Sequence, residues 1–178
     1  DPDGDPLAYE WSGPFGSAAG VAPEVLMPPG THLVSLVVSD GVDRSEPAMF
    51  EFEVRDTLPP AAVATASPDI LWPPDGRMVL VAVSLEFADA CDPAPTVVLR
   101  SIASSEAEES GRSGDDVAGA SFGEDDRQVS LRAERAGGGA GREPAAGRTY
   151  TLTWSIADAA GNAAVVSTPV TVPHDRRP

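Results

Sequence analysis

Large apolar residues alternate with polar ones along much of this chain. From Tyr150 to Ile156 every second residue is large and apolar, and hydroxyl residues fill the gaps. A period of two is typical of a β-strand with one buried face, because successive side chains point to opposite sides of a sheet. The same kind of pattern predicts strands at 7–11, 32–39, 50–55, 79–87, 96–102, 128–134 and 165–172.

Turn-forming residues separate these runs. The chain has 17 glycines and 18 prolines, which cluster between the alternating stretches, and helical periodicity is nearly absent. Many short strands with this punctuation are typical of antiparallel sandwiches. We therefore expect an all-β fold consisting of two tandem immunoglobulin-like antiparallel β-sandwiches.

Two adjacent prolines mark the expected boundary. Pro59 and Pro60 restrict the backbone and lack amide donors, so the stretch 57–60 is predicted to be a stiff connector. The expected domains are residues 1–56 and residues 61–178.

The charge is strongly negative. Among 178 residues there are 28 acidic side chains against 12 basic ones, all of them arginine, for a formal net charge of -16. Such a surface repels phosphate backbones and anionic lipids, so nucleic acid is not an expected partner. No apolar run approaches the roughly 20 residues that cross a bilayer, and we expect no membrane insertion. The acid excess serves either solubility or cation binding.

Residues for catalysis are sparse, and we expect no enzyme activity. His32, His174 and Cys91 lie far apart in the sequence, which argues against a zinc site. There is no Gly-x-Ser-x-Gly motif, and no lysine for a phosphate-binding loop. Cys91 is the sole cysteine, so an internal disulfide is impossible, and we expect a small buried side chain there.

Alternating aspartates open the chain. Asp1, Asp3 and Asp5, together with Asp40, offer the hard oxygen ligands that Ca²⁺ prefers. The spacing is not that of an EF-hand loop. The alternative is a surface turn whose carboxylates bind local backbone amides. Both interpretations stay open.

A second, weaker calcium candidate lies in the expected second domain. Its members are Asp89, Asp92, Asp158 and Asn162, in loops expected at one end of a sandwich. Ordinary turn chemistry explains the same residues. The remaining acidic runs, including Glu106 and the pair Asp115-Asp116, are expected to be solvated charge in a loop at 104–126. A Gly/Ala-rich stretch at 136–147 is expected to be another loop.

The three tryptophans divide into two groups. Trp11 and Trp154 are in phase with apolar strand residues and are expected in cores. Trp72 precedes Pro73-Pro74, and an exposed ring there is a candidate binding platform for a sugar or a partner.

The first segment resembles a polycystic-kidney-disease (PKD) or cadherin-like module over about residues 1–55. The residues that carry this are Asp1-Pro2-Asp3-Gly4-Asp5-Pro6-Leu7, Tyr9-Glu10-Trp11, Pro28-Pro29-Gly30-Thr31-His32 and Val37-Val38-Ser39-Asp40-Gly41. The opening strands of that family are missing, so the resemblance implies a sandwich truncated at its N-terminus.

The second segment looks like a hyalin-repeat (HYR)-related or bacterial Ig-like module over about residues 61–175. The resemblance rests on the segments Leu71-Trp72-Pro73-Pro74, Asp89-Ala90-Cys91-Asp92-Pro93, Leu131–Arg135, Arg148-Thr149-Tyr150-Thr151, Asp158–Asn162 and Val170–Asp175. Members often have a second cysteine, which this chain lacks.

Both resemblances imply a non-catalytic spacer or adhesion module of a larger exported protein, rigidified by calcium in one interpretation. The expected location is extracellular or at the cell surface. The expected partners are neighbouring domains of the same polypeptide and a cell-surface protein or polysaccharide. The alternative is an accessory carbohydrate-binding module of an exported hydrolase.

Overall fold

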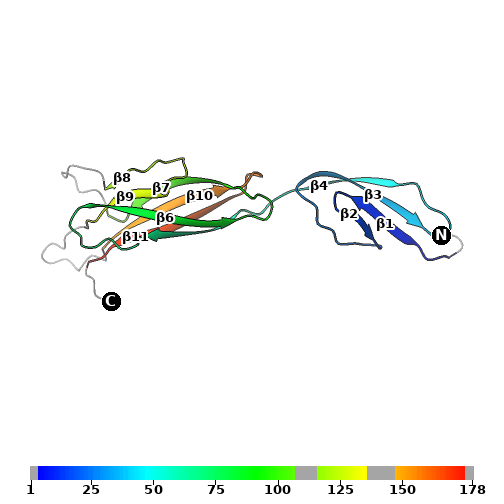
Figure 1. The fold of residues 1–178 in the computed structure, drawn as a ribbon, viewed down its shortest axis with the longest axis horizontal. Coiled ribbons are helices and arrows are strands. Elements are labelled where there is room, and N and C mark those ends of the chain that lie inside the picture. Colours follow the sequence, from blue (N-terminus) through cyan, green and yellow to red (C-terminus); the bar gives the residue numbers. More distant parts are fainter. Residues whose placement is uncertain (1–3, 107–115, 136–146, 175–178) are drawn as a thin grey trace. The chain divides into compact units, whose positions relative to one another are not determined.

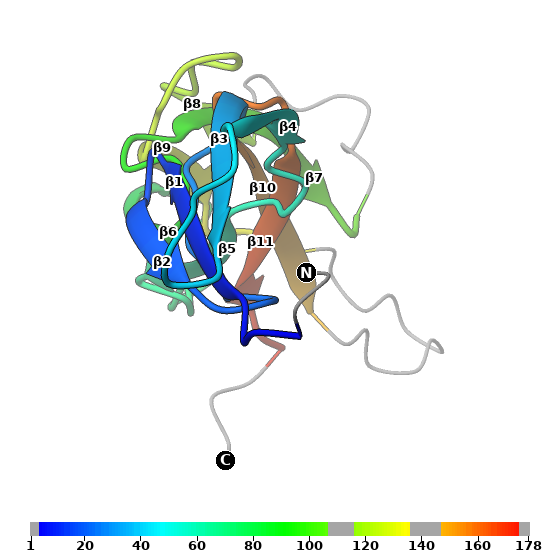
Figure 2. The ribbon, with the colours of Figure 1, turned by 90° about the vertical axis from the view of Figure 1, so that its right-hand side faces the viewer.

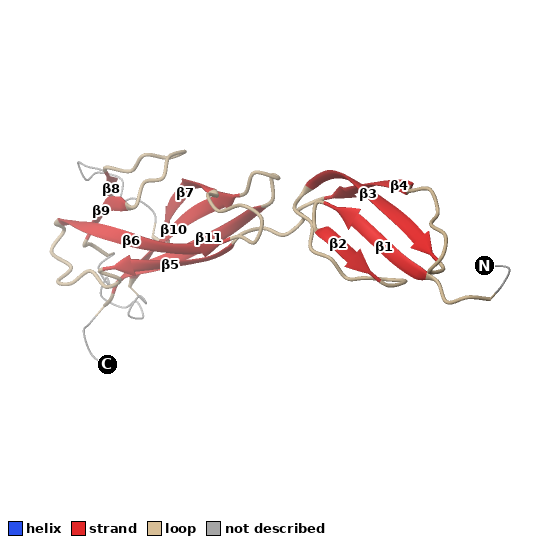
Figure 3. Cartoon of the chain, turned by 45° about the vertical axis from the view of Figure 1, so that its right-hand side comes forward, coloured by secondary structure: helices blue, strands red, loops and turns tan. Residues whose placement is uncertain are grey.

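In the part of the chain that the structure describes, the regular secondary structure is all β-strand. The structure is a computed structural model that describes residues 4–106, 116–135 and 147–174. Within these ranges it contains eleven strands. Figure 3 shows the strands and the loops that connect them, without a helix. The all-β expectation is therefore confirmed. The chain forms two compact units, residues 1–57 and 58–178.

The first unit is one antiparallel sheet with the strand order β2-β1-β3-β4 (Figure 1). Its strands are β1 (Ala8–Gly13), β2 (Gly16–Ala19), β3 (Gly30–Ser39) and β4 (Ala48–Val54). Trp11 of β1 lies opposite Leu36, and Val34 of β3 lies opposite Phe50. These residues share one face, because directly paired residues project to the same side of a sheet.

The second unit is a sandwich of two antiparallel sheets. One sheet has the order β5-β6-β9-β8, and the other has the order β11-β10-β7. The strands are β5 (Ala61–Ser67), β6 (Met78–Ala88), β7 (Thr96–Ser104), β8 (Val117–Ala118), β9 (Gln128–Arg132), β10 (Arg148–Ala157) and β11 (Ala163–Val172). When the seven strands are lettered A to G in chain order, the two sheets have the orders A-B-E-D and C-F-G, the same orders as in constant-type immunoglobulin domains.

The core of the second unit lies between its two sheets. The long β10–β11 hairpin, orange to red in Figures 1 and 2, contributes Tyr150, Leu152, Trp154 and Ile156, all fully buried. They occupy alternate positions, as the sequence pattern predicts. The core position expected for Trp154 is confirmed, and its indole Nε1 donates a 3.0 Å hydrogen bond to the carbonyl of Asp126. Full burial of one such side chain stabilises a fold by about 2 kcal/mol.

A crossover ties the first strand of this sandwich to the last. After β5 the chain continues through Asp69–Leu71, and Ile70 forms a parallel bridge with Thr171 of β11. The amide of Leu71 donates to the carbonyl of Thr171, and the amide of Thr171 donates to the carbonyl of Asp69. Both hydrogen bonds are 2.8 Å long. The edge strand β11 is therefore partly covered.

Three strands were not expected from the sequence. β2 and β5 consist mainly of small residues and lack the alternation of large side chains. β8 lies inside the segment 104–126, which was expected to be an irregular loop, and it pairs with β9. Cys91 was expected to be buried but is exposed, because the turn that holds it lies outside the core.

Candidate functional site

The second set of calcium candidates gathers at one end of the second unit. Asp89 follows β6, and its Oδ1 accepts 2.8 Å hydrogen bonds from the amides of Cys91 and Asp92. Oδ1 of Asp92 accepts from the amide of Ala94 at 2.9 Å. Two successive turns, in which a carboxylate binds backbone two or three residues later, therefore shape the β6–β7 connection.

Asp92 also joins this connection to the β10–β11 turn. Its Oδ2 accepts a 2.9 Å hydrogen bond from the amide of Ala159. Within that turn, Oδ1 of the buried Asp158 accepts from the backbone of Asn162, and Oδ2 accepts from the Asn162 side chain. The four candidates thus lie in two loops that Asp92 joins, as expected from their positions at strand ends.

The electrostatics of Asp158 follow from these contacts. Burial acts to raise its pKa, but the side-chain and backbone hydrogen bonds from Asn162, with those from Gly161 and Ala160, outweigh burial. The pKa of Asp158 is therefore lower than its ordinary value. The carboxylate is held ionised as an acceptor for its own turn.

The first calcium candidate is described only in part. Asp1 and Asp3 lie outside the described residues. Asp5 and Asp40 lie at the same end of the first sheet, because Ala8 pairs with Ser39. Oδ1 of Asp40 accepts from the amides of Asp43 and Val42 at 2.7 and 2.8 Å, and these bonds lower its pKa. Asp40 therefore shapes the turn after β3, and calcium binding there stays a prediction.

The candidate binding residue Trp72 is half-buried rather than fully exposed. It lies in the crossover segment between β5 and β6, where its carbonyl accepts a 3.3 Å hydrogen bond from Arg77. Only part of the indole is therefore accessible to a sugar or a partner. Trp11 is also half-buried, and its Nε1 donates to the carbonyl of Gly20.

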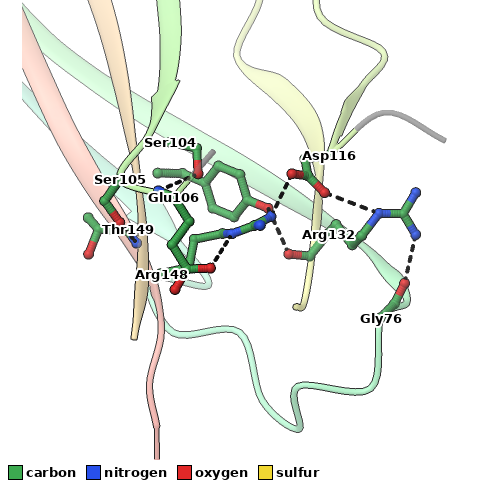
Figure 4. Close-up of polar contacts among 9 residues, drawn as sticks. Gly76, Ser104, Ser105, Glu106, Asp116, Arg132, Arg148 and Thr149 are labelled. Atoms are coloured by element: carbon green, nitrogen blue, oxygen red, sulfur yellow. Dashed lines mark hydrogen bonds and ion pairs between the residues drawn. The ribbon is translucent and has the colours of Figure 1, made fainter. Parts of the chain in front are cut away.

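A cluster of buried charge lies at the other end of β10 (Figure 4), and sequence reasoning missed it. Arg148 opens the strand with its guanidinium 2.7 Å from Asp116 and 3.1 Å from Glu106. Arg132 on β9 lies 3.4 Å from the other oxygen of Asp116. Two arginines thus balance two carboxylates. Asp116 and Glu106 were expected to be solvated loop charge, and that expectation is wrong, because each is paired with a buried arginine.

Tyr150 completes this cluster. Arg148 Nη1 donates to its hydroxyl at 2.9 Å, and the hydroxyl donates to the carbonyl of Arg132 at 3.0 Å. Burial raises the pKa of Tyr150, and the adjacent Arg148 offsets part of that effect. A hydroxyl that has a raised pKa and already both accepts and donates a hydrogen bond is a poor nucleophile. The arrangement fits a structural anchor between the sheets.

Comparison with known proteins does not assign the chain to a family. The chain matches no protein family, and neither the curated proteins nor the solved structures contain a match. Among the described residues no helix is long and apolar enough to span a membrane. The resemblances to PKD and HYR modules therefore stay predictions.

Proposed function

We propose that the chain is a non-catalytic spacer and adhesion segment of a larger exported protein, located outside the cell or at its surface. In this role it holds a neighbouring domain of the same polypeptide away from a surface. The strand order of the second unit supports an immunoglobulin-like module, a class of domain that serves this purpose on many unrelated proteins.

The observation that carries the proposal is the parallel bridge between Ile70 and Thr171. The bridge joins a segment near the beginning of the second unit to a strand near its end. Tension on the two ends pulls two parallel segments in opposite directions along their length. Their hydrogen bonds are then loaded together in shear and must break together before the sandwich opens.

The charge of the chain also supports a spacer. Acidic residues exceed basic ones by 28 to 12, and like charge keeps extended modules soluble and apart. The carboxylates described at loop ends bind backbone amides of their own turns, such as Asp89 and Asp92. These groups order the loops and present no convergent acid and base.

Single-molecule stretching of the second unit between flanking handles tests the mechanical role. Thr171→Pro removes the amide that donates to Asp69, and we expect a clear drop in unfolding force. Val165→Pro is the matched control. Val165 lies on the same strand, six residues before Thr171, so the two residues occupy equivalent positions in the strand's two-residue repeat. Equal unfolding forces for the wild type and Thr171→Pro would overturn the mechanical proposal.

The adhesion part needs a separate measurement. The intact parent protein should bind a cell surface or matrix in a pull-down, and deleting residues 1–178 should reduce that binding or shorten the reach of the remaining domains. Retained binding and reach after the deletion would contradict both the adhesion role and the spacer role.

A further inference from the structure

The sheet of the first unit has two chemically different faces. The apolar face carries Tyr9, Trp11, His32, Val34, Leu36, Val38, Phe50 and Phe52, assigned by strand register. Among the residues described for this sheet, the opposite face has no aromatic residue and mixes polar residues with aliphatic ones: Glu10, Ser12, Thr31, Leu33, Ser35, Val37, Met49, Glu51 and Glu53. A sheet with one apolar face packs that face against a second layer in stable domains.

That second layer is incomplete in the described chain. Phe50 and Phe52 on the apolar face are 42% and 44% exposed, and Val34 is the one fully buried apolar residue described in the first unit. The β2–β3 connection crosses part of the face and leaves a cavity of about 280 Å³. Trp11, Phe52 and Met27 are among its lining residues. Exposed aromatic patches of this kind mark surfaces that bind another element.

The second unit of the same chain indicates which element is needed. Its sheet β7-β10-β11 has the same order and the same antiparallel pairing as β1-β3-β4 in the first unit. In the second unit the core-facing side of that sheet is covered by the β5-β6-β9-β8 sheet, whose strands β5 and β6 precede β7 in the sequence. In the first unit the described residues provide no counterpart of β5 and β6 ahead of β1.

We propose that the apolar face of the first unit binds two β-strands supplied by the same polypeptide ahead of residue 1. These strands carry large apolar residues at every second position, as β6 does with Val79, Val81, Val83, Leu85 and Phe87, and one large apolar side chain enters the cavity beside Trp11. A second copy of this chain is a poorer occupant, because residues 1–57 contain eleven acidic side chains and two arginines and would repel each other. The proposal does not depend on the spacer function.

Thiol labelling compares the open and the covered face. Two proteins are compared. One is residues 1–178 alone, and the other carries in addition about 30 residues of the natural polypeptide ahead of residue 1, the length that Ala61–Ala88 uses for two strands. In a Cys91→Ser background, Phe50→Cys places a thiol on the apolar face. Met49→Cys is the matched control, since Met49 is the adjacent residue, is 54% exposed and projects from the opposite face.

We expect the extension to slow labelling of the Phe50→Cys thiol about tenfold or more, with the Met49→Cys rate unchanged within about twofold. If Phe50→Cys fails to fold, Phe52→Cys takes its place. Equal rates with and without the extension overturn the proposal. A second outcome would also overturn it: the thiol in residues 1–178 alone becomes more protected as the protein concentration rises, and sedimentation shows a dimer. That result would assign the face to a second copy of the chain. A natural reading frame with no residues ahead of residue 1 overturns it as well.

Discussion

Asp116 and Arg148 form an ion pair in the interior of the second unit. Their closest atoms are 2.7 Å apart, and the side chains are 15% and 5% exposed. Asp116 lies just before the short strand β8 and Arg148 opens β10, so the pair connects strands of different sheets. Arg148 also contacts Glu106, and each charge at this site has an opposite partner. Without Asp116, the buried Arg148 would keep Glu106 as its one remaining ion-pair partner among the contacts described here.

Asp116→Ala should lower the free energy of unfolding by about 3 kcal/mol, because it leaves the charge of Arg148 only partly paired. Asp125→Ala is the matched control, since the Asp125–Arg127 pair has the same 2.7 Å distance but is 45% and 36% exposed. The control should cost less than about 1 kcal/mol. Urea denaturation followed by tryptophan fluorescence measures both changes. Equal losses would show that burial does not strengthen the pair.

Gly147, immediately before β10, should be sensitive to a single added methyl group. Its φ is +87°, and a Cβ there would lie 2.5 Å from the carbonyl oxygen of Val172. Gly161 has a φ of +93°, but a Cβ there would meet no atom within 4 Å. Gly161→Ala should therefore cost about 1 kcal/mol of backbone strain, and Gly147→Ala should cost clearly more. Thermal unfolding of the two variants makes the comparison, and a smaller loss at position 147 would contradict the crowding at Val172.

Asp158 should contribute to stability in a pH-dependent manner. Its pKa is lowered in the folded chain, so its contribution is present above the unfolded pKa of about 3.9 and is lost as the pH falls through the folded pKa. Asn162→Ala removes the side-chain donor and should move the Asp158 pKa upward. A carboxyl-carbon NMR titration measures both values. No difference between wild type and Asn162→Ala would mean that the backbone bonds alone lower the pKa.

Large alternating side chains made most of the fold predictable. β10 and β6 are recognisable because every second residue is large and apolar, from Tyr150 to Ile156 in β10 and from Val79 to Phe87 in β6. β5 was not predicted, because its sequence Ala-Ala-Val-Ala-Thr-Ala-Ser packs through small residues and its alternation carries little hydrophobic contrast. β8 is two residues long and gains its strand geometry from pairing with β9, which no local pattern encodes.

The candidate sites show the same limit. Sequence position placed Asp92 and Asp158 in loops at strand ends, and these loops do contact each other. The cluster around Arg148 was not foreseen, because Glu106 and Asp116 lie in a polar segment typical of solvent-exposed loops. Both carboxylates contact Arg148, which follows them in the sequence by more than 30 residues, and Asp116 also contacts Arg132. The available signal was the position of Arg148, which is in phase with the apolar residues Tyr150, Leu152, Trp154 and Ile156.

Trp72 distinguishes the spacer from a carbohydrate-binding module. Because its indole is half-buried within the crossover segment, we expect no retardation of the chain in affinity electrophoresis against cellulose, chitin or xylan. Trp72→Ala should then migrate like the wild type in every gel. Retardation of the wild type that Trp72→Ala abolishes would favour the carbohydrate-binding alternative over the spacer.

Calcium should have little effect on the second unit. Both carboxylate oxygens of Asp92 and of Asp158 already accept hydrogen bonds within their loops. A Ca²⁺ ion would have to compete with these donors for 6–8 oxygen ligands. We therefore expect calorimetric unfolding of this unit to be the same with millimolar Ca²⁺ and with EGTA. Saturation at 100 times Kd would instead add about 2.7 kcal/mol. A gain that Asp92→Asn abolishes would contradict this expectation, whereas a gain that Asp3→Ala and Asp5→Ala abolish would assign calcium to the first unit.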